Sequence, residues 1–207
     1  KYYIKNVLIL YNLKNYIDNF WIIINDLSFD FNKIIKRSRD VANKISNNVE
    51  LLLRKNKVDR IRAFGKLSSR HQIELFDNEG KHIDSLKADK IIIATGARPR
   101  MLPSIPIDKK FIITSTEAMI LNEPPKEFVI IGAGAIGVEF AYFYNVFGSK
   151  VTLIEMMDNI LPLEDQEVSV TLEKIFKKKG IEILTKTIVE KAEIKNNKVE
   201  ITIKSNN

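Results

Sequence analysis

The amino-acid sequence predicts an α/β fold, and two features lead to that prediction. After residue 127, short apolar stretches of strand length alternate with longer stretches that have helical spacing. A glycine-rich turn, Gly-x-Gly-x-x-Gly, lies between the first of these strands and the first of these helices. Together the two features are typical of Rossmann-like domains, in which helices cover an open, mostly parallel sheet.

The first part of the chain is less regular. Residues 1–30 are rich in Asn, Ile and Tyr and show no clean period. From residue 31 to residue 54 the spacing predicts one long amphipathic helix, with Asp30 as the cap of its first turn. Its apolar positions recur three or four residues apart, and they are Val41, Ile45, Val49, Leu52 and Leu53.

A small antiparallel meander is predicted to follow this helix. The segments 58–63 (VDRIRA) and 71–76 (HQIELF) alternate or nearly alternate apolar and polar residues, as strands do. Residues 77–81 (DNEGK) have the composition of a turn, because Asn and Gly accept positive φ angles.

A buried strand is expected at 88–99 (ADKIIIATGARP), where it ends in a second glycine turn. Three prolines, Pro99, Pro103 and Pro106, keep the next stretch free of helix. Residues 122–127 (NEPPKE) place two prolines between charged residues and are predicted to be a linker.

The β-α-β-α pattern begins after this linker. Strands are predicted at 128–131, 150–155, 181–184, 188–194 and 199–203, and helices at 135–147 and 165–179. The second helix has an acidic start and the basic end Lys177–Lys179, and Gly180 follows it, as dipole and capping preferences require. An Asn-Asn turn joins the last two strands.

Composition excludes several classes of function. Hydrophobic residues make up 45% and charged residues 29% of the 207 residues, and no apolar run is long enough to span a membrane. There is no cysteine, so disulfides, cysteine-bound zinc and thiol chemistry are absent from this sequence, and we expect no metal site. The first residue is Lys1 and no leader pattern follows, so we expect a cytoplasmic protein and an internal piece of a longer gene product.

The net charge and the two histidines indicate no further function. The net charge of +7 comes from basic residues spread along the chain without an aromatic platform, so no nucleic-acid partner is expected. The two histidines, His71 and His82, lie in polar strand-and-turn segments, where a surface position is expected.

The glycine turn predicts a dinucleotide site. Gly132 allows a tight turn, Gly134 lets the backbone approach a diphosphate without a Cβ, and Gly137 lets the helix pack close to the strand. The free N–H groups and partial positive charge of the helix N-terminus favour phosphate. The alternative is that the glycines serve close packing alone.

The nucleotide is predicted from the end of the next strand, KVTLIE. Its last residue, Glu155, would accept hydrogen bonds from a ribose 2′-OH and repel a 2′-phosphate. Residues 156–158 (MMD) contain no arginine that could bind such a phosphate. The sequence therefore favours NAD over NADP.

These segments resemble the dihydrolipoamide dehydrogenase branch of the pyridine nucleotide-disulfide oxidoreductases, over roughly residues 31–207. The resemblance rests on KRSRDVANKISNNVELLLRKNKVD, ADKIIIATGARPR, ITSTEAM, FVIIGAGAIGVEFAYFYNVFGSKVTLIE and ILPLEDQEVS. It implies FAD/NAD(P)-binding Rossmann-like domains with a three-layer ββα arrangement. Residues 1–30 match poorly, 31–123 would be a partial FAD-binding domain, and 124–207 would be a partial NAD-binding domain.

The resemblance also implies which residues contact the cofactors. NAD would contact Gly132, Ala133, Gly134, Ala135, Ile136, Gly137, Glu139, Glu155 and Val189, and FAD would contact Gly65, Thr95, Gly96 and Ala97. Glu139 matches an acid that in the family pairs with a lysine beside the flavin. Its alternative interpretation is a solvated acid favoured by the helix dipole.

The family's redox cysteine pair, its own FAD glycine loop and its His-Glu pair are not in this sequence, which therefore has no catalytic residue of that kind. The resemblance implies that the complete enzyme is a homodimer that reoxidises dihydrolipoamide on an acyltransferase partner. Electrons would pass by way of the cysteine pair and FAD to NAD. This chain alone is expected to be inactive. A sister reductase of the mercuric, glutathione or NADH-oxidase type and a non-catalytic nucleotide-binding remnant stay open as alternatives.

Overall fold

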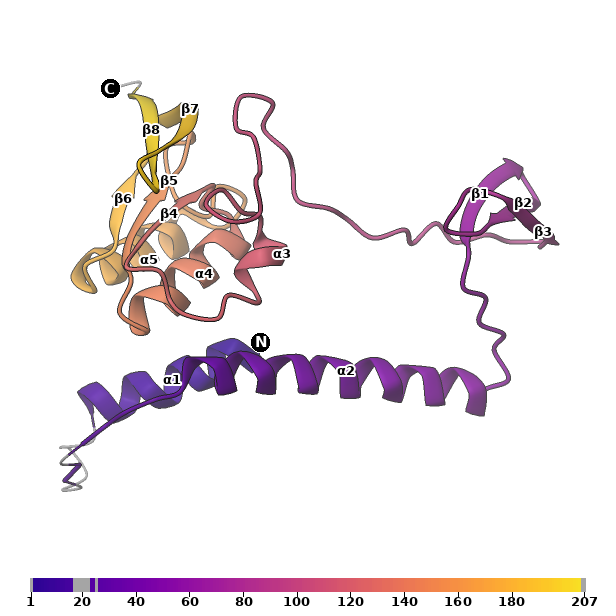
Figure 1. Ribbon diagram of the computed structural model, residues 1–207, viewed down its shortest axis with the longest axis horizontal. Coiled ribbons are helices and arrows are strands. Elements are labelled where there is room, and N and C mark those ends of the chain that lie inside the picture. The colour runs from indigo at the N-terminus through magenta and orange to yellow at the C-terminus, as the bar shows by residue number, and fades with distance from the viewer. Residues whose placement is uncertain (1, 17–22, 25, 206–207) are drawn as a thin grey trace. The chain divides into compact units, whose positions relative to one another are not determined.

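The computed structural model describes residues 2–16, 23–24 and 26–205. They form two compact units, one made of residues 1–41 and 99–207 and the other of residues 42–98, and each is described separately below (Figure 1). The predicted division into 1–30, 31–123 and 124–207 concerns the domains of the complete family fold and stays a prediction.

The larger unit is built on a parallel sheet with strand order β4-β5-β6. The sheet consists of β4 (Glu127–Ile131), β5 (Lys150–Ile154) and β6 (Glu182–Leu184). Helix α4 (Ala135–Val146) connects β4 to β5, and helix α5 (Gln166–Lys178) connects β5 to β6. This β-α-β-α-β order confirms the predicted Rossmann-like fold.

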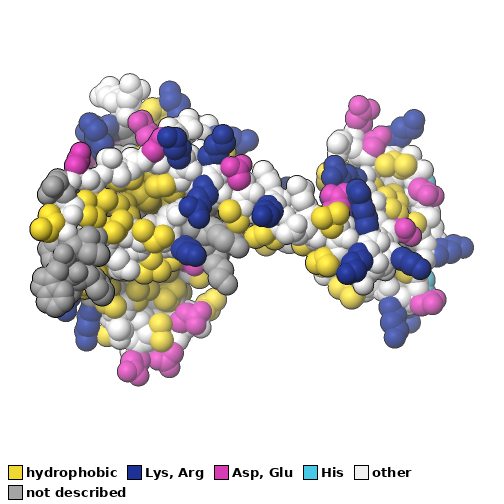
Figure 2. Space-filling model, turned by 90° about the horizontal axis from the view of Figure 1, so that it is seen from below, with side chains coloured by type: hydrophobic (Ala, Val, Ile, Leu, Met, Phe, Trp, Pro, Cys, Tyr) yellow, Lys and Arg dark blue, Asp and Glu magenta, His cyan; other side chains and the backbone are white. Residues whose placement is uncertain are grey.

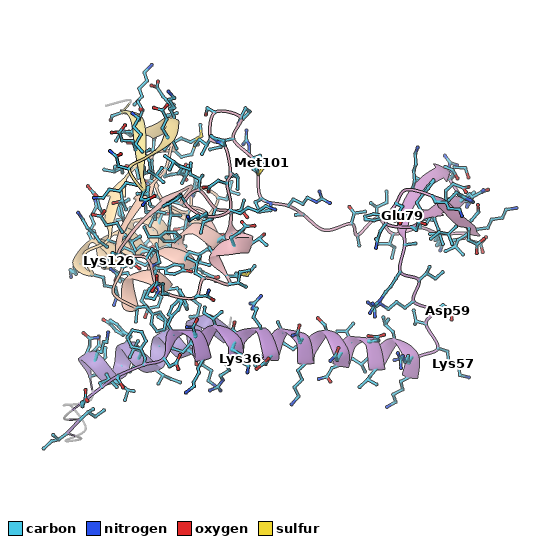
Figure 3. The ribbon with its side chains drawn as sticks, in the orientation of Figure 1. Lys36, Lys57, Asp59, Glu79, Met101 and Lys126 are labelled. Carbon is cyan, nitrogen blue, oxygen red and sulfur yellow. The ribbon has the colours of Figure 1, made fainter. Side chains whose placement is uncertain are left out.

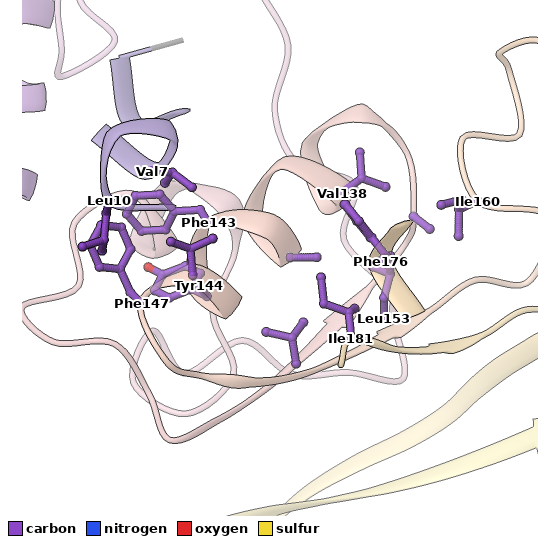
Figure 4. Packing of buried hydrophobic residues seen from close by; sticks show 14 of the residues in the cluster. Val7, Leu10, Val138, Phe143, Tyr144, Phe147, Leu153, Ile160, Phe176 and Ile181 are labelled. Carbon is purple, nitrogen blue, oxygen red and sulfur yellow. The ribbon is translucent and has the colours of Figure 1, made fainter. Parts of the chain in front are cut away.

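The hydrophobic core of this unit lies between the sheet and its helices. Val151 of β5 is fully buried. Leu153 of β5, Tyr144 of α4 and Ile160 of the loop between β5 and α5 are fully buried as well (Figure 4). The Tyr144 hydroxyl donates a hydrogen bond to the Ala118 carbonyl at 2.5 Å, which ties α3 (Ser115–Ala118) to α4.

The hairpin that follows the sheet was predicted almost residue for residue. Strands β7 (Thr187–Lys195) and β8 (Lys198–Ser205) pair antiparallel. Asn196 and Asn197 both have positive φ angles, 50° and 59°, which is the backbone of a two-residue type I′ turn.

Helix α1 (Tyr2–Asn15) occupies part of the segment whose sequence shows no period. Val7 and Leu10 are buried in the same core cluster as Phe143 and Phe147 of α4 (Figure 4). Leu8 and other apolar residues of α1 are exposed, so apolar residues face several sides and no helical period results. Figure 2 shows hydrophobic side chains gathered on the face of the larger unit that is seen from below.

Helix α2 (Phe31–Lys55) runs from the first unit into the second. The predicted cap is present, because Asp30 Oδ1 accepts a hydrogen bond from the Lys33 N–H at 3.0 Å. Phe31 and Ile35 are buried, whereas the predicted apolar face at Ile45 and Val49 is about half exposed.

The smaller unit contains an antiparallel sheet of order β1-β2-β3. Its strands are β1 (Phe64–Ser69), β2 (Gln72–Phe76) and β3 (His82–Lys87). The predicted turn between β2 and β3 is confirmed, with Gly80 at φ 81° and the Asp77 carboxylate accepting two backbone N–H groups. Figure 3 shows Glu79 at this turn.

Two predicted strands are wrong. Residues 58–63 are irregular and the first strand begins only at Phe64, while residues 88–99 contain no strand. In 88–99, Ile92 and Ile93 are largely exposed. A buried parallel strand needs neighbouring strands for its hydrogen bonds. No strand among the described residues pairs with either segment.

The described residues contain neither a membrane-spanning helix nor a cluster of metal ligands. No helix there is both long and apolar enough to cross a bilayer. Within the same residues, no three His, Asp or Glu side chains gather closely enough to hold a metal ion.

Candidate functional site

The site lies where β4 ends and α4 begins. Gly132 has φ 99°, a conformation that side chains other than hydrogen rarely tolerate. Its N–H donates to the Ile154 carbonyl at 2.8 Å, which fixes the turn against the end of β5. Gly132 is therefore required by the turn itself.

Gly137 is required by packing. A Cβ at this position would lie 2.0 Å from the Gly132 carbonyl oxygen, far inside van der Waals contact. The first turn of α4 therefore crosses the glycine turn at a distance that only glycine permits.

Neither backbone conformation nor packing requires glycine at position 134. Its φ angle is −71°, which any residue adopts, and a Cβ there would meet no atom within 4 Å. The space beside Gly134 is open, and a Cβ would occupy it. Gly134 is also the N-cap of α4, where glycine is modestly preferred over alanine. The close approach of a ligand to the backbone is the explanation that accounts for the open space as well.

Unpaired donors surround this open space. Hydrogen bonding within α4 starts with the Val138 N–H, which donates to the Gly134 carbonyl at 3.1 Å. Within the described part of the chain, the N–H groups of Gly134, Ala135 and Ile136 have no acceptor, and Gly134 caps α4 without a side-chain hydrogen bond. These donors and the positive end of the helix dipole fit a phosphate group.

Glu155 faces the glycine turn, and its carboxylate is more constrained than the sequence suggested. The residue is only 6% exposed. Oε2 accepts a hydrogen bond from the Ala133 N–H at 2.7 Å, and Oε1 accepts one from the Met157 N–H at 2.9 Å. The carboxylate therefore braces the turn, while each oxygen keeps a second lone pair.

Sequence reasoning missed Leu161. Its N–H donates to the Ala133 carbonyl at 2.8 Å, and its φ angle is 48°, which is strained for a leucine. The adjacent Ile160 is fully buried. With Glu155 on its N–H and Leu161 on its carbonyl, Ala133 is held on both sides, and no short sequence pattern predicts such a contact.

The other predicted NAD residues lie around this turn in different environments. Glu139 is exposed on α4, and its proposed pairing with a lysine beside the flavin stays a prediction. Val189 of β7 is buried with Ile105 and Ile154 in a second small core. The structure therefore brings Gly132–Gly137 and Glu155 together, and it gives the Val189 side chain a packing role.

The predicted FAD residues belong to the smaller unit. Gly65 lies exposed in β1, where a Cβ would be 3.2 Å from Ile73 Cγ2, a tight contact that a small shift of that side chain would relieve. Gly96 has φ 77° and lies with Thr95 and Ala97 in exposed irregular backbone. The arrangement of these residues forms no enclosed site for a flavin.

Exposed apolar side chains come from the segments next to the glycine turn. Ile136 lies in the first turn of α4, Met156 and Met157 follow Glu155, and Leu163 follows the loop residue Leu161. All four are at least half exposed. Phosphate donors with apolar neighbours suit a ligand that has both a charged diphosphate and flat rings.

Comparison with known proteins gives a consistent result. The family model described as pyridine nucleotide-disulphide oxidoreductase matches residues 10–207. Dihydrolipoyl dehydrogenase of Zymomonas mobilis is 47% identical over 162 residues, which are 78% of this chain and 34% of the relative. The same enzyme of Bacillus subtilis is 38% identical over 175 residues, 81% of this chain and 37% of the relative.

Solved structures show the same likeness. LpdA from Mycobacterium tuberculosis matches 98% of this chain and 44% of its own length, with a TM-score of 0.86 and 25% identity. The HOCl-induced flavoprotein disulfide reductase RclA from Escherichia coli matches 84% of this chain and 39% of its own length, with a TM-score of 0.71 and 29% identity. The chain spans about a third to a half of the length of the curated relatives.

Proposed function

The chain belongs to the pyridine nucleotide-disulphide oxidoreductase family, and we propose that its larger unit binds the NAD of a dihydrolipoyl dehydrogenase. The single observation that carries this proposal is Gly134. Neither backbone strain nor packing requires glycine there, and the space that a Cβ would fill adjoins unpaired N–H groups. A diphosphate fits that space and those donors.

The residues of the turn would hold the diphosphate in a fixed place. Ala133 is tied to Glu155 and to Leu161, so its backbone is held whether or not a ligand is bound. The N–H groups of Gly134, Ala135 and Ile136 then point from a rigid turn. Pre-organised donors bind more tightly because little ordering is needed when the ligand arrives.

Glu155 would distinguish NAD from NADP. Its two oxygens each accept one backbone hydrogen bond and retain a lone pair for a ribose hydroxyl. A 2′-phosphate at the same place would face a buried carboxylate, and like charges at close range repel more strongly where burial lowers the effective dielectric constant. NAD is therefore the preferred nucleotide.

The activity of the complete protein is proposed from the relatives named dihydrolipoyl dehydrogenase. Nicotinamide and flavin supply the redox chemistry in such an enzyme, and the protein supplies binding and orientation. Electrons from dihydrolipoamide would reach NAD by way of a cysteine pair and FAD. This sequence contains no cysteine, so the part of the enzyme that it contributes is the nucleotide-binding site.

The flavin contacts of Gly65, Thr95, Gly96 and Ala97 are proposed on the resemblance alone. Their geometry in the smaller unit adds no support, because Thr95–Ala97 lie in exposed irregular backbone. The acyltransferase partner, the homodimer and the cytoplasmic location are likewise proposed from the family.

Nucleotide binding tests the first part of this proposal. We expect the 207-residue chain to bind NAD weakly and to bind it more tightly than NADP, as measured by ligand-observed NMR. Equal affinity for the two nucleotides, or a preference for NADP, would contradict the role of Glu155.

Enzyme assays test the second part. The native protein that contains this sequence should reduce NAD with dihydrolipoamide as electron donor. Activity only with oxidised glutathione or mercuric ion would favour a sister reductase, and activity with none of these donors and acceptors would favour a non-catalytic nucleotide-binding protein.

A further inference from the structure

Two exposed methionines directly follow the acid of the candidate site. Met156 is 61% exposed and Met157 is 51% exposed, and both lie in the bend that follows β5, the central strand of the sheet. Single exposed apolar residues are common on protein surfaces. Here two large ones adjoin a buried carboxylate, and the backbone of Met157 is fixed.

Hydrogen bonds at both ends of the Met157 peptide fix that backbone. Its N–H donates to Glu155 Oε1 at 2.9 Å, and its carbonyl accepts from the Lys186 N–H at 2.9 Å. The exposed thioether therefore stays close to Glu155. Its flexibility is confined to the side chain.

The chemistry of a nucleotide places the adenine ring near these side chains. Under the proposed function, Glu155 accepts a hydrogen bond from the ribose 2′-OH. The ribose carbon next to that hydroxyl carries the adenine, so the ring lies close to whatever surrounds the acid. Methionine sulfur makes favourable contacts with aromatic rings, and the unbranched side chain adapts to their edges.

We propose that Met156 and Met157 form the adenine-side wall of the nucleotide site and that their oxidation to sulfoxides weakens nucleotide binding. This inference rests on the proposed function. The class of oxidant is a two-electron oxygen donor such as hydrogen peroxide. The peroxide O–O bond breaks, one oxygen forms a bond to the methionine sulfur, the sulfur is oxidised by two electrons, and water leaves.

Methionine sulfoxide lacks the apolar character by which the thioether would contact the adenine ring. A sulfoxide is polar and carries a hydrogen-bond acceptor where the thioether was apolar. Contact with the face or edge of an adenine ring is then lost, and an acceptor is added beside the Glu155 carboxylate. No cysteine in this sequence competes for the oxidant.

The chain provides a matched control. Met101 is 57% exposed, as accessible as the pair, but it lies in the irregular segment before α3 and not beside Glu155. Met101→Leu removes one exposed thioether without touching the site. The double variant Met156→Leu/Met157→Leu removes the two that are proposed to matter.

The experiment compares nucleotide affinity before and after peroxide treatment in the wild type and in both variants. NAD and ADP are the probes, because ADP contains only the adenine half. Mass spectrometry of peptides identifies the oxidised methionines, and methionine sulfoxide reductase reverses the reaction.

We expect oxidation to raise the Kd of the wild type for both probes by about two- to tenfold, the size of one or two lost sulfur–aromatic contacts. Met101→Leu should show the same increase, the double variant none, and the reductase should restore the original Kd. An unchanged Kd after oxidation of Met156 and Met157, or an equal increase in the double variant, would overturn the inference while leaving the proposed function intact. Absence of NAD and ADP binding before treatment would overturn both.

Discussion

Replacing the glycines of the turn one at a time distinguishes the glycine that the fold requires from the glycine that ligand binding requires. In Gly137→Ala, the new Cβ would begin 2.0 Å from the Gly132 carbonyl oxygen, and backbone cannot rotate away as a side chain can. Overpacking of this kind costs about 1–3 kcal/mol or more. For a unit of about 150 residues this corresponds to a Tm lowered by roughly 2–12 °C.

Gly134→Ala should behave differently. Its φ angle suits alanine and its Cβ would meet nothing, so the loss of freedom in the unfolded chain stabilises the fold by about 0.4–1 kcal/mol. Alanine is a poorer helix cap than glycine by a similar amount, about 0.5–1 kcal/mol. The two effects nearly cancel, and Tm should change by less than about 3 °C.

The loss of NAD affinity should be greatest for Gly134→Ala, the variant whose stability changes least. Gly134→Ala fills the space assigned to the diphosphate, so we expect the Kd for NAD to rise at least about tenfold, which is about 1.4 kcal/mol. Differential scanning fluorimetry measures Tm, and ligand-observed NMR measures binding.

Gly180→Ala is the control for these two variants. Gly180 has φ 78° and follows α5, away from the glycine turn, so alanine should cost about 1–2 kcal/mol of stability and leave affinity unchanged. If Gly134→Ala binds NAD as tightly as the wild type, the ligand explanation for Gly134 is wrong.

Four further outcomes are expected. Glu155→Gln should lower the free energy of unfolding by about 1–3 kcal/mol, since glutamine has one acceptor oxygen and leaves either the Ala133 or the Met157 N–H without an acceptor. The same change should reduce the preference for NAD over NADP; the exposed Glu127→Gln is its control, and an unchanged nucleotide preference would count against the ribose role. Tyr144→Phe should cost about 1–3 kcal/mol in urea unfolding because the Ala118 carbonyl loses its donor, and a change below about 0.5 kcal/mol would mean that the bond contributes little. Hydrogen bonds, first from Ser85 and then from Gln72 and His82, lower the pKa of Glu74 to about 2. The stabilisation that these bonds give is therefore fully present above the ordinary pKa of 4.5 and is lost as the pH falls towards 2. A carboxyl NMR titration of Glu74 with a midpoint near 4.5 would contradict this lowered pKa. The 207-residue chain alone should show no dihydrolipoamide-dependent NAD reduction, because it has no cysteine, and measurable turnover would refute the assigned mechanism.

Local patterns predicted the elements that local chemistry determines. Asp30 caps α2 and Asp165 caps α5 because a carboxylate reaches N–H groups two or three residues ahead. The Asn196–Asn197 turn needs only two residues that tolerate positive φ. Such features depend on neighbours in the chain and can be recognised in a single sequence.

Features that depend on distant partners were harder to predict. Residues 88–99 have the composition of a buried strand, but a strand forms only where neighbouring strands supply hydrogen bonds. In the site, the position of Glu155 beside the turn was predicted from the strand that precedes it. Its bond to Ala133, and the strained Leu161 on the other side of Ala133, depend on the three-dimensional path of the loop.

An amide-resolved NMR titration shows whether the N–H groups at the start of α4 that have no acceptor among the described residues bind the diphosphate of NAD. Adding NAD to the ¹⁵N-labelled chain should shift the Gly134, Ala135 and Ile136 resonances most, with smaller shifts for residues 42–98. If these three resonances do not move at saturating NAD, or if only other residues shift, the diphosphate does not bind at this helix start.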